Sequence, residues 1–106
     1  MTKVDELFDI CKDLKEEHII QACKNYNYEL SALNRRDNNV ILYSGSYYKL
    51  KQTIRKANDM ILGNSIKLDS PEYKKGGEYD FTANYFVKLF EAKFGNSTQI
   101  KLVRLR

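Results

Sequence analysis

Two groups of cationic residues, one of them beside a pair of tyrosines, are the side chains in this sequence best suited to hold an anionic partner. Residues 40–58 run from an apolar stretch, through a turn at residues 44–46, into a helical pattern rich in lysine and arginine. Guanidinium and ammonium groups bind carboxylates and phosphates, and an exposed tyrosine ring can stack on a base or a sugar. The candidate binding residues are Arg35, Arg36, Tyr48, Lys49, Lys51, Arg55 and Lys56.

The sequence motifs of several enzyme classes are absent. The chain contains no phosphate-binding loop, no dinucleotide-binding glycine pattern, no nucleophile elbow, no H-E-x-x-H zinc motif and no EF-hand loop. Its only histidine, His18, has no serine or cysteine paired with it by a known local motif. We therefore expect a histidine whose hydrogen bonds are satisfied at the core or its boundary, rather than a catalytic base. The sequence therefore predicts a protein that is not an enzyme, with no cofactor and no metal site.

The two cysteines, Cys11 and Cys23, are expected to be reduced and buried. Twelve residues along one helix separate two backbones by about 18 Å, whereas a disulfide needs roughly 7 Å or less between the α-carbons. With one histidine and no C-x-x-C, they also form no credible zinc set.

A partial resemblance to a nuclease family lies in the same region. A hairpin, then Tyr43-Ser44-Gly45, then a basic helix resembles the second half of the GIY-YIG nuclease core, over about 30 residues. The position of that family's first motif tyrosine is held here by Ala32, and the position of its arginine by Thr53, with Arg55 out of step. The resemblance implies a catalytically degenerate GIY-YIG-like domain.

The N-terminal 25 residues are expected to be helical. Thr2 and Asp5 have the spacing of a capping box, and apolar residues follow with a helical period. The pattern extends to about Asn25 either as one helix or as two, because the charged residues 15–17 could interrupt it.

A β-hairpin is predicted next, formed by residues 28–33 and 40–43. The first segment alternates between apolar and polar residues, whereas the second is continuously apolar and is expected to be central in a sheet and covered on both faces. Arg35 and Arg36 lie at the tip of this predicted hairpin, either as solvated turn residues or as phosphate or carboxylate contacts.

A basic helix is predicted from Ser46 until Gly63-Asn64 ends it. Its helical period places Tyr47 in the inward stripe and leaves Tyr48 as the exposed aromatic residue. The inward stripe is predicted to be Tyr47, Leu50, Ile54, Ala57 and Ile61.

The C-terminal third is expected to contain a short strand at residues 66–68, a mobile surface loop over residues 69–80, a helix and a final strand. Asp80 is the predicted N-cap of the helix, whose phenylalanines should fill the core: Phe86, Phe90 and Phe94. The alternation in residues 98–106 changes phase near Val103, which predicts either a bulge or a strand buried on both faces.

These elements predict one α+β domain over residues 1–106. Their order is α-β-β-α-(β)-α-β, with a mainly antiparallel sheet of three to four strands packed by helices. A chain of 106 residues with 42% hydrophobic residues can bury a core of its own.

Composition narrows the class of partner. The net charge is +4, and the excess of positive charge lies in residues 30–68.

No apolar run is long enough to cross a membrane, and the acidic first residues do not resemble a signal peptide, so a cytoplasmic protein without a membrane partner is predicted. Frequent Lys, Asn, Ile and Tyr residues, which have AT-rich codons, suggest a low-GC bacterium, a phage or a plasmid.

The first functional hypothesis is a small non-catalytic binding protein, an inhibitor or accessory factor of a mobile genetic element. It would dock on a larger acidic protein or nucleoprotein complex through its basic face. The alternative is a nucleic-acid-binding module whose six cations contact phosphates directly. A solvated basic face without a partner and a homodimer built on the terminal strand remain open as well.

Overall fold

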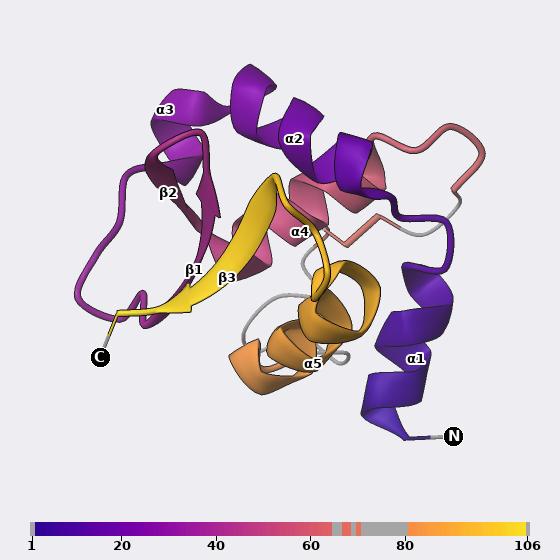
Figure 1. Cartoon of the computed structure of the whole chain (residues 1–106). Coiled ribbons are helices and arrows are strands. Elements are labelled where there is room, and N and C mark those ends of the chain that lie inside the picture. Colours follow the sequence, from indigo (N-terminus) through magenta and orange to yellow (C-terminus); the bar gives the residue numbers. More distant parts are fainter. Residues whose placement is uncertain (1, 65–66, 69, 71–80, 106) are drawn as a thin grey trace.

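The computed structural model describes residues 2–64, 67–68, 70 and 81–105 (Figure 1). Over these residues the chain forms an α+β fold in which helices pack on a three-stranded antiparallel sheet, as predicted. The helices are α1 (Lys3–Ile10), α2 (Glu16–Asn25), α3 (Asn27–Leu30), α4 (Leu50–Asp59) and α5 (Ala83–Phe94), and the strands are β1 (Asn39–Tyr43), β2 (Ser46–Lys49) and β3 (Ile100–Arg104).

The N-terminal segment forms two helices rather than one. The capping box that opens α1 is present, since the amide of Asp5 donates to the Thr2 hydroxyl (3.2 Å) and the Asp5 carboxylate accepts from the Thr2 amide (3.3 Å). The Thr2 hydroxyl also donates to the Asp5 carboxylate (2.8 Å), and this hydrogen bond, together with the one from the Thr2 amide, lowers the pKa of Asp5. At the start of α2, half-buried His18 accepts a 2.9 Å hydrogen bond through Nδ1 from the amide of Lys15, so it has the predicted boundary role.

The predicted strand over residues 28–33 is wrong, because this segment begins with the short helix α3. Its alternating pattern does not correspond to two faces of a sheet: Tyr28 is 93% exposed and Leu30 is fully buried, while Ala32 lies exposed in the following loop. Arg35 and Arg36 therefore lie in a loop between α3 and β1, not at the tip of a hairpin.

The observed hairpin joins β1 to β2 through the turn at Ser44 and Gly45. The segment predicted as the first helical turn is thus strand β2, and α4 begins only at Leu50. This difference reverses the predicted orientation of the two tyrosines: Tyr48 is buried (3% exposed), whereas Tyr47 is 42% exposed.

The strand order is β2-β1-β3, so β1 is central, as predicted. The register between β1 and β3 runs without interruption from Asn39 opposite Arg104 to Tyr43 opposite Ile100, which excludes the predicted bulge. The predicted alternative, a strand buried on both faces, is closer to the structure, because Leu102 and Val103 are both half-buried on opposite faces of β3.

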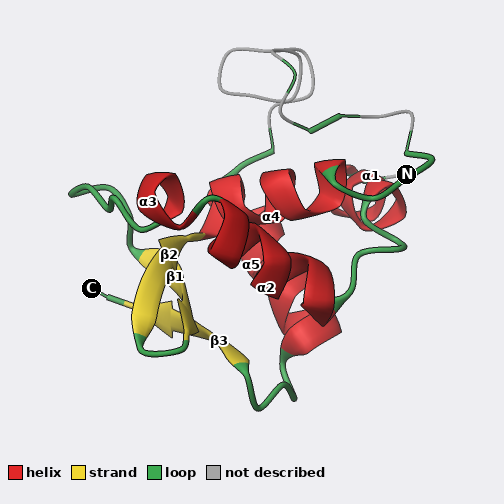
Figure 2. Ribbon diagram, turned by 90° about the horizontal axis from the view of Figure 1, so that it is seen from above, coloured by secondary structure: helices red, strands yellow, loops and turns green. Residues whose placement is uncertain are grey.

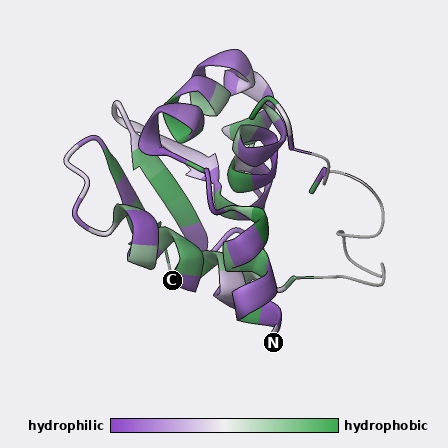
Figure 3. Cartoon of the chain, turned by 90° about the vertical axis from the view of Figure 1, so that its right-hand side faces the viewer, coloured by the Kyte–Doolittle hydropathy of each residue, from purple (hydrophilic) through white to green (hydrophobic). Residues whose placement is uncertain are grey.

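The core lies between the sheet and the helices, with α2, α4 and α5 on one side of the strands (Figure 2). Phe86, Phe90 and Phe94 are buried, which confirms the core role predicted for α5. Figure 3, coloured by hydropathy, shows hydrophobic residues along the sheet and both hydrophobic and hydrophilic residues on each helix. Both cysteines are buried free thiols.

Several predictions for the C-terminal half concern residues outside those described, among them Asp80, Ile66 and most of the loop 69–80. The residue before α5 that the structure describes as its N-cap is Thr82. In the described part of the chain, no helix is long and apolar enough to cross a membrane.

Candidate functional site

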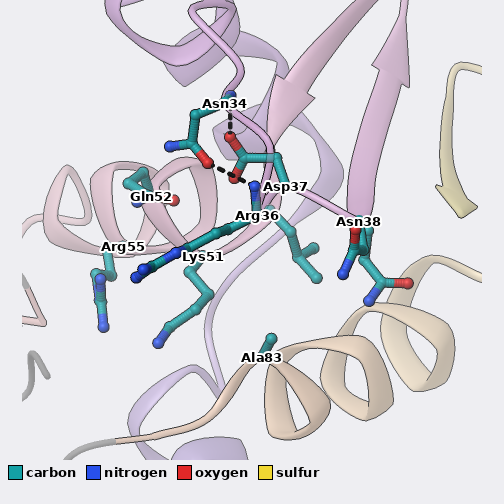
Figure 4. A pocket seen from close by; sticks show the side chains of 10 residues that line it. Asn34, Arg36, Asp37, Asn38, Lys51, Gln52, Arg55 and Ala83 are labelled. Atoms are coloured by element: carbon teal, nitrogen blue, oxygen red, sulfur yellow. Dashed lines mark hydrogen bonds between the residues drawn. The ribbon is translucent and has the colours of Figure 1, made fainter. Parts of the chain in front are cut away.

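Three of the seven predicted binding residues line one basic groove on the surface of the molecule. Arg36 comes from the loop between α3 and β1, and Lys51 and Arg55 come from α4. The groove has a volume of about 410 Å³ and continues to Ala83, the first residue of α5 (Figure 4). We call it the basic groove; its lining is completed by Asn34, Asp37, Asn38, Asn39, Leu50 and Gln52.

The loop that carries Arg36 is held by hydrogen bonds within the loop. The Asp37 carboxylate accepts from the amide of Asn34 (2.7 Å), and the Asn34 side-chain oxygen accepts from the amide of Arg36 (2.9 Å), as drawn in Figure 4. The carbonyl of Asn38 accepts a 2.7 Å hydrogen bond from the amide of Leu105, which ties the loop to the end of β3. Short polar side chains that bond to nearby backbone amides favour such turns.

Two of the three cations of α4 are positioned by α5. Lys51 and Arg55 are four residues apart, so they share one face of the helix. The Lys51 ammonium nitrogen lies 5.8 Å from the centroid of the Phe86 ring, and the Arg55 guanidinium carbon lies 5.7 Å from it. Arg55 is only 6% exposed, and Phe86 is fully buried. A phenylalanine predicted only as core thus also supports the wall of the groove.

The electrostatics of the basic groove favour an anion. Three cationic side chains line it and end in the same region of Figure 4, whereas Asp37 is the one carboxylate among the described residues of the lining. That carboxylate accepts a backbone hydrogen bond, as described above. Arginine side chains offer paired N–H donors that match the two oxygens of a carboxylate or the oxygens of a phosphate.

Two other predicted binding residues make contacts within the fold. The Tyr48 hydroxyl accepts a 2.6 Å hydrogen bond from the side-chain amide of Asn27, which joins β2 to α3. The Lys56 ammonium lies 4.7 Å from the centroid of the Tyr26 ring and 3.9 Å from a Glu29 carboxylate oxygen. Lys56 therefore lies against Tyr26 and Glu29, in the segment where α2 ends and α3 begins.

The remaining two predicted residues are near the basic groove but do not line it. Arg35 is exposed in the same loop as Arg36, and Lys49 is the last residue of β2. No pattern in the sequence indicated that Asn34 and Asp37 organise this loop, although the polar run 34–39 did indicate a turn. The spacing of Lys51 and Arg55 was the one local signal that two cations share a surface.

Among the described residues, no group of three or more His, Cys, Asp or Glu side chains is placed to hold a metal ion. The nuclease resemblance also relies on the predicted hairpin, whose first strand (residues 28–33) begins instead with helix α3, and strand β2 separates Gly45 from the basic helix α4. Ala32 is exposed and Thr53 is buried on α4, so neither supplies a polar group to the basic groove. No protein-family model, curated protein or solved structure matches the chain.

Proposed function

We propose that this chain is a small non-catalytic binding protein that docks on a larger acidic protein, and that the basic groove receives a carboxylate of the partner. One observation carries the proposal: Arg36, Lys51 and Arg55 come from two separate segments and line one groove. The AT-rich composition supports the narrower proposal of an inhibitor or accessory factor from a phage or plasmid.

Protein docking is favoured over direct nucleic-acid binding by the position of the aromatic residues. Tyr48, the predicted stacking residue, is buried and hydrogen-bonded to Asn27. None of the described residues that line the basic groove is aromatic. Single-strand binding proteins combine cations with aromatic stacking surfaces, and the described lining of the groove supplies only the cations.

Charge reversal in the groove tests the proposal. The double variant Arg36→Glu, Lys51→Glu replaces two cations of the groove, and the control Lys12→Glu, Lys88→Glu makes the same change of net charge at two exposed lysines outside it. Binding of a fluorescent glutamate-rich peptide is measured by anisotropy for all three proteins. We expect the groove variant to bind at least about tenfold more weakly than wild type, and the control to bind within about twofold of it, because charge pairs in the groove contribute through close contacts.

A mixed-sequence DNA and an RNA of the same length serve as competing probes. Binding of either nucleic acid at low salt, with an affinity that falls steeply as the salt concentration rises and that the groove variant loses, would support the nucleic-acid alternative instead. Equal weakening by the groove variant and its control would show that net charge alone is responsible, and would contradict the proposal. Capture of one stoichiometric protein from nuclease-treated lysate by wild type but not by the groove variant would then identify the partner.

A further inference from the structure

The face of the sheet that points away from the core is unusually apolar. Every second residue of each strand points toward the helices, and the face that these residues form contributes Ile41, Tyr48 and Ile100 to the hydrophobic core. The opposite face, which we call the outer sheet face, is formed by Val40 and Leu42 of β1, Tyr47 and Lys49 of β2, and Lys101 and Val103 of β3. In antiparallel sheets with one solvated face, polar residues usually occupy these positions.

The apolar residues of this face form a continuous strip. The register places Leu42 between Tyr47 and Lys101, and Val40 between Lys49 and Val103. Val40 is fully buried, so the accessible part of the strip consists of Tyr47, which is 42% exposed, and of the half-buried Leu42 and Val103. None of these three belongs to the core cluster. Helices α2, α4 and α5 lie on the other side of the strands (Figure 2). A contiguous apolar strip on an open face is typical of an interaction site.

The charges on this face select the partner. Both charged residues of the outer sheet face are lysines, Lys49 and Lys101, and no carboxylate stands among its six residues. Two copies of the chain packed face to face would bring four lysines together, which is unfavourable. An occupant that carries carboxylates beside an apolar surface complements both features.

The spacing of the strands indicates which element of the partner fits. Lys49 and Lys101 lie on the two outer strands, on either side of β1. Neighbouring strands are about 4.8 Å apart, so these two strands are separated by roughly 10 Å, which is close to the diameter of a helix with its side chains. A helix lying along β1 would press an apolar stripe against Leu42 and would have one lysine on each flank.

We propose that the outer sheet face binds an acidic amphipathic helix of a partner protein. The apolar stripe of that helix covers Leu42, Tyr47 and Val103, and its flanking carboxylates pair with Lys49 and Lys101. The outer sheet face shares no residue with the basic groove. The two proposals are therefore independent, and either can fail without the other.

The probe is a synthetic peptide of about 18 residues, with leucines at helical spacing and glutamates on the flanks, titrated into the ¹⁵N-labelled chain. We expect shifts of the amides of the outer sheet face. The variants Tyr47→Ser and Lys101→Glu should each weaken binding by about tenfold, since each removes a contact on one side of the central residue Leu42. Lys88→Glu on α5 and Lys12→Glu are the matched controls, since both are exposed lysines outside the outer sheet face and outside the basic groove, and each should leave the affinity within about twofold of wild type.

Three results would overturn the inference. The first is no shift of the outer sheet face at millimolar peptide, or shifts confined to the basic groove. The second is equal affinity for a peptide with every glutamate changed to lysine, which would show that the lysines do not select the partner. The third is a dimer in sedimentation that Tyr47→Ser dissociates, which would make a second copy the occupant. If Tyr47→Ser does not fold, Lys101→Glu still tests the inference, because Lys101 is exposed and its substitution leaves the core intact.

Discussion

The side-chain amide of Asn27, the first residue of α3, donates a hydrogen bond of 2.6 Å to the hydroxyl oxygen of Tyr48 on β2. The variant Tyr48→Phe keeps the buried ring but removes the acceptor of this part-buried hydrogen bond. We expect the free energy of unfolding to fall by about 1 kcal/mol, as is usual for one hydrogen bond within a protein. Urea denaturation should show a lower midpoint with an unchanged slope.

A double-mutant cycle tests whether this loss of stability comes from the hydrogen bond between Asn27 and Tyr48. Tyr48→Phe should cost clearly less in an Asn27→Ala background than in the wild type, because the partner is already absent there. Equal costs in the two backgrounds would show that the two side chains do not interact.

The turn between β1 and β2 makes a second prediction. Ser44 has φ of 50° and Gly45 has φ of 80°, so both central residues are left-handed, as in the type I′ turns of two-residue hairpins. A Cβ added at Gly45 meets nothing within 4 Å, so the cost of Gly45→Ala is purely conformational, and we expect about 1 kcal/mol. Ser44→Asn should raise stability by about 0.5 kcal/mol, because asparagine tolerates this conformation better than serine.

Thermal unfolding distinguishes the two turn variants. For a domain of this size, 1 kcal/mol corresponds to a shift of about 4–8 °C in Tm. Gly45→Ala should therefore melt several degrees lower, and Ser44→Asn a few degrees higher. A neutral Gly45→Ala variant would be inconsistent with a positive φ at this position in solution.

The elements that the sequence predicted correctly are those fixed by local interactions. The capping box at Thr2 and Asp5 determines the start of α1, and the helical period of the phenylalanines determines the buried face of α5. The continuously apolar run 40–43 likewise indicated a central strand. In each case the residues that decide the structure lie within a few positions of one another.

The segments predicted wrongly are decided by partners far along the chain. Residues 46–49 fit a helical turn as well as a short strand, and pairing with β1 selects the strand. The orientation of Tyr48 depends on Asn27, which lies 21 positions earlier. Period alone could therefore not show that Tyr47 is exposed and Tyr48 buried.

The same division applies to the basic groove. The four-residue spacing of Lys51 and Arg55 predicted that they share a helix face. Their grouping with Arg36 depends on how the loop 34–38 folds and on its hydrogen bond to Leu105, contacts between distant segments. Lys56 has a structural contact for the same reason, because Tyr26 belongs to a part of the chain that local patterns do not place beside α4.

A third prediction concerns the ring beneath the groove. Phe86 lies within 6 Å of the charged groups of Lys51 and Arg55 and meets Phe81 edge to face at 6.5 Å. Lys51→Met, which keeps most of the side-chain length but removes the charge, should cost about 0.5–1 kcal/mol through the lost cation–π contact. In a Phe86→Leu background the same change should cost less, because the aromatic ring is already gone.

The readout is the difference between these two costs, measured by urea denaturation at one pH and one salt concentration. Phe86→Leu alone is expected to lower stability by about 1–2 kcal/mol, since a buried ring is replaced by a smaller side chain. If Lys51→Met costs the same in both backgrounds, the ring does not contribute to holding the lysine.

The buried thiols make the fourth prediction, a loss of stability at high pH. Cys11 and Cys23 are fully buried, and burial raises the pKa of each thiol from 9.0 to about 12. Below pH 9 the folded and unfolded chains both keep these protons, so the thiols add no pH dependence. Between pH 9 and about 12 the unfolded chain releases them and the folded chain does not, so the free energy of unfolding falls as the pH rises.

The expected slope from each thiol is at most about 1.4 kcal/mol per pH unit within that window. Tyrosines also ionise there, so the measurement compares wild type with Cys11→Ala, Cys23→Ala, in which the tyrosines are retained. Urea denaturation at several values of pH should give a shallower decline for the double variant. In parallel, a thiol reagent at pH 8 should label the native chain slowly and the urea-unfolded chain rapidly, because the unreactive protonated thiols become accessible and ionisable only on unfolding. Rapid labelling of the native chain, or the same decline in both proteins, would show that the thiols are not held in the buried, protonated state.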